Sequence, residues 1–206
     1  MKKGEETKRK LVAATAVLLQ RKGFHATGLS DIVAESGAPR GSIYFYFPDG
    51  KESLACAALD ESGERWREAI LAVVASERDP AKSILAVCTF LAASLESSHY
   101  EEGCPLATVA LEAAASSEAV RATVSRHYVL WTEVIADRLL AAGIPDEAAS
   151  RLSTFVLSTI EGALLLSKVH RSKQPLLDAG AMLATLASSL GHAEPPTAPR
   201  RKPARQ

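Results

Sequence analysis

A short stretch of the chain combines a guanidinium group, several hydroxyls and a run of aromatic rings. It reads RGSIYFYF and begins at Arg40. A guanidinium can donate two hydrogen bonds to a guanine or hold a phosphate, hydroxyls bond phosphates or base edges, and aromatic rings contact thymine methyl groups. A glycine beside them lets the backbone come close. The residues that suit contact with nucleic acid are Arg40, Gly41, Ser42, Tyr44, Phe45 and Tyr46.

Two other residues of this stretch have the spacing of a buried helix face. Ile43 and Phe47 stand at i and i+4, so they share one side of a helix and should hold it against its neighbours. The alternative interpretation is that every ring from 44 to 47 belongs to the core. A unit of three helices cannot bury four consecutive aromatic side chains, so at least two of them should be exposed.

Other groups with reactive side chains fit catalysis poorly. The cluster His99, Glu101, Glu102 and Cys104 has metal-ligand types, but its spacing matches no established metal site, and an exposed loop between helices explains it better. Neither a Gly-x-Ser-x-Gly motif nor a phosphate-cradling glycine loop occurs. We therefore predict no enzymatic site, no metal site and no cofactor. Cys104 precedes a predicted helix, where a thiolate is favoured, so redox sensing is an alternative to a buried apolar role.

The elements that must position the aromatic stretch are helices. A first helix runs from about residue 6 to 22, and Gly23 ends it. A second spans 29–36, is capped by Thr27 or Ser30 and is closed by Gly37. The third begins near Pro39, which a first helical turn accommodates. Two short helices joined by so tight a turn, after a longer helix, form a helix-turn-helix at about residues 28–47.

The rest of the chain also has apolar residues at helical spacing, with Pro and Gly between the segments. Asp49 and Glu52 resemble a capping box for a long fourth helix through Trp66 and Ile70. The fold class is therefore all-α with about nine helices. Later helices begin at about Pro80, Pro105 and Ser117 and span about 147–170 and 175–190.

The last two helices predict a homodimer. The first of them is apolar nearly all round, and the pair would be covered by the same two helices of a second copy, with Gly162, Ala179 and Ala187 allowing close approach. Its apolar stretch is broken by Glu161 and Lys168, so we predict no membrane span. Three widely spaced cysteines and no signal-peptide core fit the cytoplasm.

Charge is uneven along a chain whose formal net charge is zero. Residues 1–54 carry nine Lys and Arg against six Asp and Glu, residues 55–191 carry eleven against seventeen, and residues 192–206 carry four against one. A basic end on an acidic body suits a protein whose N-terminal part meets phosphates. The proline-rich stretch 191–206 is predicted to be a disordered basic tail.

The stretch GFHATGLSDIVAESGAPRGSIYFYFPDGKESL, residues 23–54, resembles the DNA-binding domain of the TetR family of bacterial regulators. The matching positions follow the family's order and spacing. They are the Gly-Phe after the first helix, Thr27, Asp31-Ile32, Gly37, Gly41 to Tyr44, Phe47 and Lys51-Glu52. The turn from Gly37 to Ser42, the extra residue between Phe47 and Lys51, and the later Gly103-Cys104-Pro105-Leu106 are similar to the LmrA/YxaF-type subgroup.

The resemblance implies a DNA-binding domain at 6–66 and a ligand-binding and dimerisation domain at 67–190. It implies a repressor that binds a near-palindromic operator, a double-stranded DNA site, as a dimer, with Lys51 as a phosphate clamp. The residues expected to contact DNA are Thr27, Ser30, Arg40, Gly41, Ser42, Tyr44, Phe45, Tyr46 and Lys51.

The same resemblance implies a pocket for a small-molecule effector whose binding alters the spacing of the two DNA-binding heads. Candidate lining residues are Trp66, Phe90, Tyr128 and Trp131, although helical spacing alone explains each as a core residue. An apolar lining would favour a lipophilic or aromatic effector. The alternative is a helical small-molecule-binding or redox-sensing protein, through Cys104, without DNA contact.

Overall fold

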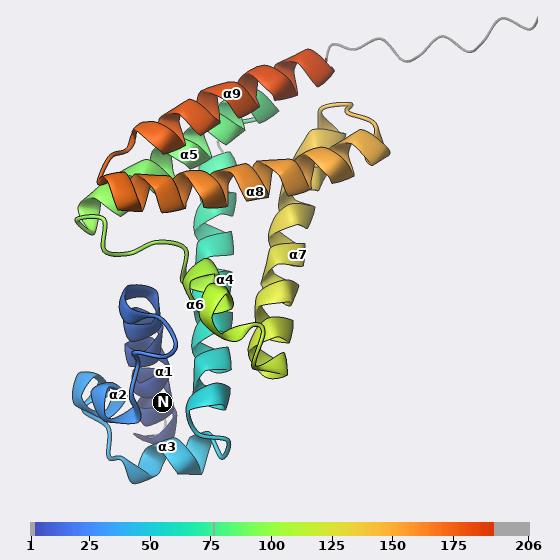
Figure 1. The fold of residues 1–206 in the computed structure, drawn as a ribbon. Coiled ribbons are helices and arrows are strands. Elements are labelled where there is room, and N and C mark those ends of the chain that lie inside the picture. Colours follow the sequence, from blue (N-terminus) through green and yellow to red (C-terminus); the bar gives the residue numbers. More distant parts are fainter. Residues whose placement is uncertain (1–2, 76, 192–206) are drawn as a thin grey trace, which may run out of the picture.

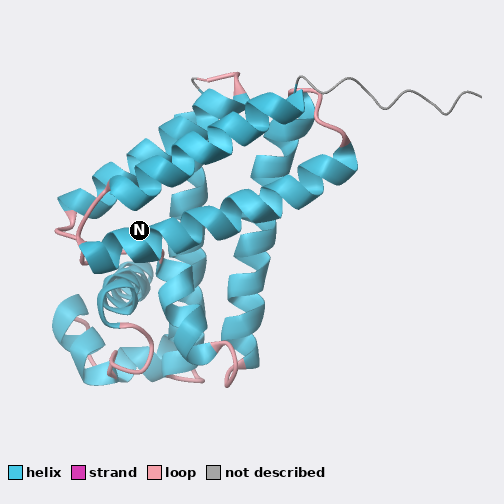
Figure 2. Cartoon of the chain, turned by 45° about the horizontal axis from the view of Figure 1, so that its top comes forward, coloured by secondary structure: helices cyan, strands magenta, loops and turns pink. Residues whose placement is uncertain are grey.

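The computed structural model describes residues 3–75 and 77–191, and within them every regular element is a helix (Figures 1 and 2). This agrees with the all-α class and the expected number of helices. The helices are α1 (Lys3–Lys22), α2 (Leu29–Ser36), α3 (Gly41–Tyr46), α4 (Lys51–Ala75), α5 (Pro80–Ser97), α6 (Pro105–Ala113), α7 (Glu118–Ala141), α8 (Asp146–His170) and α9 (Gln174–Gly191). The predicted basic tail lies outside the described residues apart from Gly191, which ends α9.

Glycines end the first two helices where the sequence predicts. Gly23 has φ +78° after α1, and Gly37 has φ +65° after α2, where its backbone N–H donates to the carbonyl of Val33. Positive φ is the conformation that favours glycine over residues with a Cβ. The predicted cap of α2 is wrong, because the N-cap is Gly28, whose N–H donates to the Asp31 carboxylate at 3.3 Å.

Helix α3 begins slightly later than predicted. Pro39 and Arg40 form a tight turn before it, in which the N–H of Ser42 donates to the Pro39 carbonyl at 2.9 Å. The residues from 37 to 40 therefore separate α2 from α3, and Arg40 is the N-cap of α3. This shift leaves the Arg40 side chain at the very start of the helix, exposed to solvent.

Helix α4 links the small N-terminal unit, formed by α1, α2 and α3, to the rest of the molecule (Figure 1). The expected capping box at its start is wrong. The positive-φ Gly50 precedes the helix, and its carbonyl accepts from the N–H of Leu54 at 3.2 Å. The Glu52 carboxylate instead accepts a hydrogen bond from the hydroxyl of Ser117, the N-cap of α7. A tertiary contact replaces the local cap, and the helix crosses the predicted domain boundary at 66/67 without a break.

The rest of the molecule, called the body below, consists of α5 to α9 and the part of α4 that they surround. Helices α5 and α9 pack side by side at one end, α8 crosses beside them, and α7 runs along α4 (Figures 1 and 2). Gly180 makes the α5–α9 approach possible, because a Cβ there would stand 2.8 Å from the Cβ of Cys88. The short α6 lies between the N-terminal unit and the other helices of the body and contacts α1, α4 and α7.

Helix α8 is long and apolar enough, by length and composition alone, to cross a membrane. Core helices of globular proteins share this property. In this fold α8 packs against α5, α7 and α9, and Leu152, Val156 and Leu164 of its inner face are buried. Its outer face carries apolar side chains that nothing in the described protomer covers. They are Phe155, Leu165, Leu166 and Val169, each at least half exposed.

Candidate nucleic-acid interface and internal cavity

Helix α3 is held to the N-terminal unit by the two residues that its spacing identified. Ile43 is fully buried and Phe47, at the C-cap, is 4% exposed, so both belong to the core with Leu11 and Leu54. A six-residue helix has little stability of its own, and this packing is what fixes its orientation. The opposite side of α3 is left free to meet a partner.

The exposed side of α3 gathers the predicted contact residues. Tyr44 is 53% and Phe45 77% exposed, which confirms that the aromatic run is only partly core. Arg40 and Gly41 are exposed beside them and Ser42 is partly exposed. A Cβ added to Gly41 would meet no atom within 4 Å, so the backbone there is open to close approach from outside. A guanidinium, hydroxyls and rings thus share one exposed surface, as a major-groove helix requires.

Tyr46 takes a different position from the other two aromatics. It is half-buried against the core, and its hydroxyl lies beside the backbone of Gly4 on α1, 2.7 Å from where a Cβ of that residue would stand. Its ring packs edge-on against Phe45, with 4.8 Å between centroids. The hydroxyl of Tyr46 therefore points toward the start of α1, while its ring supports Phe45 from behind.

Thr27 corrects one expectation. Its side chain is fully buried, and its hydroxyl donates to the Gly23 carbonyl at 2.7 Å. The residue fixes the turn between α1 and α2 and cannot present its side chain to DNA. Ser30, the other predicted contact on α2, is exposed.

Lys51 lies at the start of α4, but its ammonium is turned back toward the α1–α2 turn. The Nζ atom lies 4.5 Å from the centroid of the Phe24 ring and 3.5 Å from the carbonyl oxygen of His25. Burial lowers the pKa of Lys51, an effect that the nearby Glu112 carboxylate partly offsets. A phosphate clamp at this position would require the side chain to swing outward.

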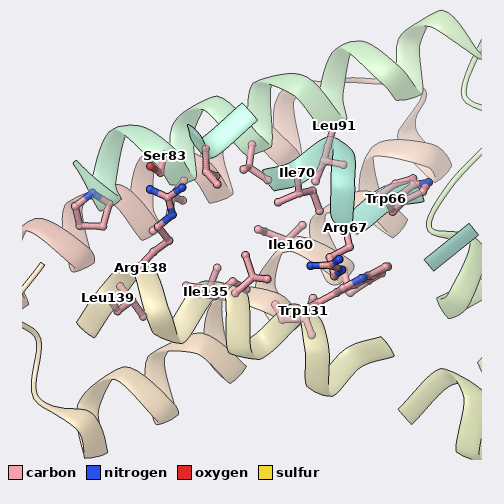
Figure 3. Close-up of a pocket in the computed structure, with 18 of the residues that line it drawn as sticks. Trp66, Arg67, Ile70, Ser83, Leu91, Trp131, Ile135, Arg138, Leu139 and Ile160 are labelled. Carbon is pink, nitrogen blue, oxygen red and sulfur yellow. The ribbon is translucent and has the colours of Figure 1, made fainter. Parts of the chain in front are cut away.

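An internal cavity lies between α4, α5, α7 and α8 (Figure 3). Its volume is about 80 Å³, and most of the side chains that line it are apolar. Trp66 from α4 and Trp131 from α7 stack at one end, with ring centroids 6.3 Å apart and planes 19° from parallel. Both predicted tryptophans therefore line it. The other lining residues include Ile70, Val74, Ser83, Ile84, Val87, Leu91, Ile135, Leu139, Val156 and Ile160.

The other two predicted lining residues lie outside this cavity. Tyr128 packs edge-on against Trp131, 5.7 Å between centroids, so it supports the wall from behind. Phe90 is 38% exposed on the outer side of α5. Its spacing placed it on a helix but did not say which face the cavity would take, and Leu91 is the residue that lines the wall.

A buried polar network stands behind the cavity wall. Glu161 lines the cavity from α8 and is hydrogen-bonded to the Cys104 thiol at the N-cap of α6, which in turn is hydrogen-bonded to Tyr128. Burial raises the pKa of Glu161 to about 7, against the hydrogen bond from Cys104, which lowers it. Burial also raises the pKa of Tyr128, and the nearby Glu161 carboxylate adds to the effect.

The surroundings of Cys104 contradict the redox-sensing alternative. The residue is 4% exposed, and burial, reinforced by the Glu161 charge, holds the pKa of its thiol well above the usual value. A reactive cysteine needs an accessible thiolate, and neither condition is met. The Sγ atom instead caps α6 by accepting from the N–H of Ala107 at 3.4 Å.

Two arginines on the cavity wall were not singled out from the sequence. Arg67 on α4 is paired with Glu64 of the same helix through two contacts of 2.5 and 2.9 Å. Arg138 stands in the last turn of α7, at the opposite end of the cavity from the tryptophans (Figure 3). Charged residues at helical spacing are normally assigned to the solvated face, and only the packing of α4 and α7 against the other helices of the cavity reveals that these side chains reach it.

The N-terminal unit is tied to the body by polar contacts on α6 and the loop before it. The N–H of His25 donates to the Glu112 carboxylate at 2.7 Å, and the Gln20 amide donates to the Gly103 carbonyl at 2.8 Å. Arg21 forms an ion pair with a carboxylate of the same loop, that of Glu102, at 3.0 Å. A displacement of α6 would therefore be felt by the helix-turn-helix.

Two family models match this chain, one mainly in the N-terminal unit and one in the body. Residues 11–58 match the family described as bacterial regulatory proteins, tetR family, and residues 80–182 match the LmrA/YxaF-like transcriptional regulator C-terminal domain. The HTH-type transcriptional regulator YxaF of Bacillus subtilis (strain 168) is 35% identical over 172 residues, which are 84% of this chain and 90% of that protein. The chain belongs to the TetR family.

Another TetR-family relative, the HTH-type transcriptional regulator LmrA of Bacillus subtilis (strain 168), is 36% identical over 84% of this chain and 92% of that protein. Among solved structures, a TetR transcriptional regulator from Chloroflexus aurantiacus J-10-FL superimposes with a TM-score of 0.78 at 30% identity, over 91% of this chain and 97% of that one. The protein is thus a DNA-binding transcriptional regulator of this family rather than an enzyme.

Proposed function

We propose that this TetR-family regulator is a cytoplasmic repressor that binds a near-palindromic operator as a homodimer and leaves it when a small lipophilic molecule occupies the internal cavity. The observation that carries the DNA-binding part is α3. Buried Ile43 and Phe47 anchor this helix, while Arg40, Tyr44 and Phe45 are exposed beside the open backbone of Gly41. Such a helix can enter the major groove without disturbing its own support.

The contacts that we assign to this surface divide by type. The Arg40 guanidinium reads a guanine or holds a phosphate, the hydroxyls of Ser42 and Tyr44 bond phosphates or base edges, and Phe45 contacts a thymine methyl group. Ser30, exposed on α2, and Lys51, once its side chain swings outward, bond backbone phosphates. Tyr46 acts mainly by supporting Phe45.

Dimerisation is supported by the outer faces of α8 and α9. Phe155, Gly162, Leu166 and Val169 fall on one stripe of α8 at helical spacing, and a Cβ on Gly162 would meet nothing in the protomer. Met182 on α9 is 70% exposed. Apolar patches of this kind mark interaction surfaces, and a second copy would cover both helices in a four-helix interface. Ala187, expected in that interface, is instead buried inside the protomer.

Release by an effector is supported by the direct connection of the cavity to the helix-turn-helix through α4. Helix α4 lines the cavity with Trp66 and Ile70 and begins next to the helix-turn-helix. The cavity of about 80 Å³ is small beside the 300–1,000 Å³ of typical ligand sites, so an occupant must push its walls apart. Displacement of α4 or α6 would change the spacing of the two heads. The transcriptional repressor DhaR of Mycobacterium sp. (strain GP1), 25% identical over 79% of this chain, supports repression over activation.

Selection of DNA from a random duplex library tests the proposal directly. Purified full-length protein should enrich one sequence of near-palindromic form, whose half-sites are separated by about one helical turn or a multiple of it. The selected site should also occur upstream of the protein's own gene or a neighbouring gene. Failure to enrich any sequence, or enrichment of a site without two-fold symmetry, would contradict the proposed mode of binding.

A further inference from the structure

The polar side chains on the cavity wall are nearly all engaged within the protein. The Ser83 hydroxyl donates to the Glu77 carbonyl at 3.2 Å, and the charge of Arg67 is neutralised by its two contacts with Glu64. These groups therefore have little left to offer an occupant, and their presence does not select its charge.

Among the described residues that line this cavity, Glu161 is the only carboxylic acid, and it too has a partner. It is hydrogen-bonded to the Cys104 thiol of the N-cap of α6, and Tyr128 is the third member of that network. Burial favours the neutral form of this carboxyl below about pH 7, and in that form it does not act as a counter-ion for a cation.

Arg138 differs from the rest of the lining. No acidic group lies within ion-pair distance of its guanidinium anywhere in residues 3–75 and 77–191. The side chain extends from α7 across the end of the cavity toward Ser83 on α5 (Figure 3). A position in the last turn of α7 favours a positive charge through the helix dipole, but it does not require that the charge face an apolar cavity.

The two ends of the cavity are well separated. Trp131 and Arg138 are seven residues apart on α7, which corresponds to about 10 Å along the helix axis. The aromatic pair lies at one end, beside the Glu64-paired Arg67, and the unpaired Arg138 guanidinium lies at the other, and most of the lining side chains between them are apolar (Figure 3). The lining thus resembles the complement of a narrow molecule that is apolar for most of its length and negatively charged at one end.

We propose that the cavity takes a lipophilic anion, whose apolar or aromatic body lies against the Trp66–Trp131 pair and whose carboxylate or equivalent acid group pairs with Arg138. This inference rests on the proposed function, which makes the cavity the effector site, and it adds the charge and orientation of the ligand. Arg138 is then the residue that determines specificity for acids over neutral molecules of the same shape.

A matched series of three probes separates charge from shape. The probes are 4-phenylbutanoate, 4-phenylbutanamide and 4-phenylbutylammonium, and each is titrated into the full-length protein at low ionic strength. Tryptophan fluorescence reports on this cavity specifically, because both tryptophans of the chain line it. We expect the anion to bind about tenfold more tightly than the amide, which corresponds to about 1.4 kcal/mol. The ammonium should bind most weakly.

Variants assign the preference to one side chain. Arg138→Gln should abolish the advantage of the anion over the amide while leaving amide binding within about twofold, which also shows that the variant is folded. Arg138→Lys should retain part of the advantage, since it keeps the charge without the bidentate geometry. The control is Arg121→Gln on the same helix, whose guanidinium is paired with Glu118 away from this cavity. It should leave all three affinities unchanged.

Several outcomes would overturn the inference. The inference fails if the amide binds as tightly as the anion, or if the anion does not bind at millimolar concentration. It also fails if Arg138→Gln weakens the binding of the anion and the amide equally. Tightest binding by the ammonium, with that binding lost in Glu161→Gln, would assign the cavity to cations instead. A neutral or cationic probe that still released the selected operator would leave the proposed function intact and refute only the charge assignment. Failure of the operator selection would instead refute the proposed function and not the measured probe affinities.

Discussion

The surroundings of the Glu161 carboxyl disfavour its ionised form. It lies in an otherwise apolar part of α8, and burial raises its pKa to about 7 from an ordinary value of 4.5. A native carboxyl with a raised pKa retains its proton at pH values where the unfolded chain has lost it. Between about pH 4.5 and 7 the folded protein therefore binds more protons than the unfolded one.

This difference predicts a pH-dependent effect of Glu161→Gln on stability. The contribution of Glu161 makes the protein less stable as pH rises from 4.5 to 7 and is constant above that. The variant should be similar to wild type near pH 4.5 and more stable by up to about 3 kcal/mol at pH 8, from 1.36 kcal/mol per pH unit between the two pKa values. Denaturant unfolding of both proteins at several pH values measures this difference, and a pH-independent difference would contradict it.

The sequence predicts residues whose position follows from local spacing, but not residues whose position depends on the packing of distant helices. Ile43 and Phe47 could be assigned because burial of one helix face follows from spacing alone. Arg138 and Glu161 could not, since a charged residue becomes part of a cavity only through the packing of helices far apart in sequence. The sequence shows that Glu161 interrupts the apolar helix α8. It does not show that this carboxyl is buried beside Cys104 of the N-cap of α6, which is far away in sequence.

The turn between α2 and α3 has a glycine at each end, Gly37 and Gly41, and the two are needed for different reasons. Gly37 has φ +65° and a Cβ there would meet nothing, so its requirement is purely conformational. Gly41 begins α3, and a Cβ there would also meet nothing within the protein. Its requirement, in the proposed function, is the close approach of DNA.

Paired alanine substitutions at these two positions should therefore have different effects. Gly37→Ala should lower the free energy of unfolding by about 1 kcal/mol, because a Cβ disfavours the left-handed conformation. Gly41→Ala should leave stability unchanged or slightly raised, since alanine is the better helix former, and should weaken operator binding. Thermal unfolding and a binding assay on each variant distinguish the two roles. Equal losses of stability, or full operator affinity in Gly41→Ala, would argue against this division.

Element boundaries were predictable where local rules act alone. Helix α2 begins and ends at the predicted residues because apolar spacing and a left-handed glycine agree, and α5 begins at Pro80 as predicted. The start of α4 was not predictable, since Glu52 bonds Ser117 at the N-cap of α7 instead of its own helix end. A long-range partner for a side chain cannot be inferred from three-residue spacing.

In the proposed dimer, operator binding requires the two helix-turn-helix units to be held at a fixed separation. Within one protomer α4, α6 and the loop before α6 connect the helix-turn-helix to the rest of the body, and Lys168 of α8 donates to the Glu101 carbonyl of that same loop at 2.9 Å. The proposed dimer face on α8 is therefore linked to the head through a short chain of contacts. Separation of the protomers should abolish high-affinity binding even when each head is intact.

Charges on the outer stripe of α8 should produce monomers. The double variant Phe155→Glu and Leu166→Glu introduces two carboxylates into the proposed interface, where burial without a partner is costly. It should elute and scatter light as a folded monomer and lose operator affinity. The control Leu111→Glu, at a residue of α6 that is 82% exposed, should remain a dimer. A double variant that stays dimeric would place the interface elsewhere.

If α3 reads DNA, the variant Arg40→Ala must bind the selected operator more weakly than the wild type does. Fluorescence anisotropy would compare wild type, this variant and Lys82→Ala, which removes an exposed charge on α5 far from α3. Loss of an arginine contact to a base costs about 1–3 kcal/mol per half-site, so Arg40→Ala should bind at least tenfold more weakly while Lys82→Ala is unchanged. Wild-type affinity in a folded, dimeric Arg40→Ala protein would contradict the assignment of α3 as the recognition helix.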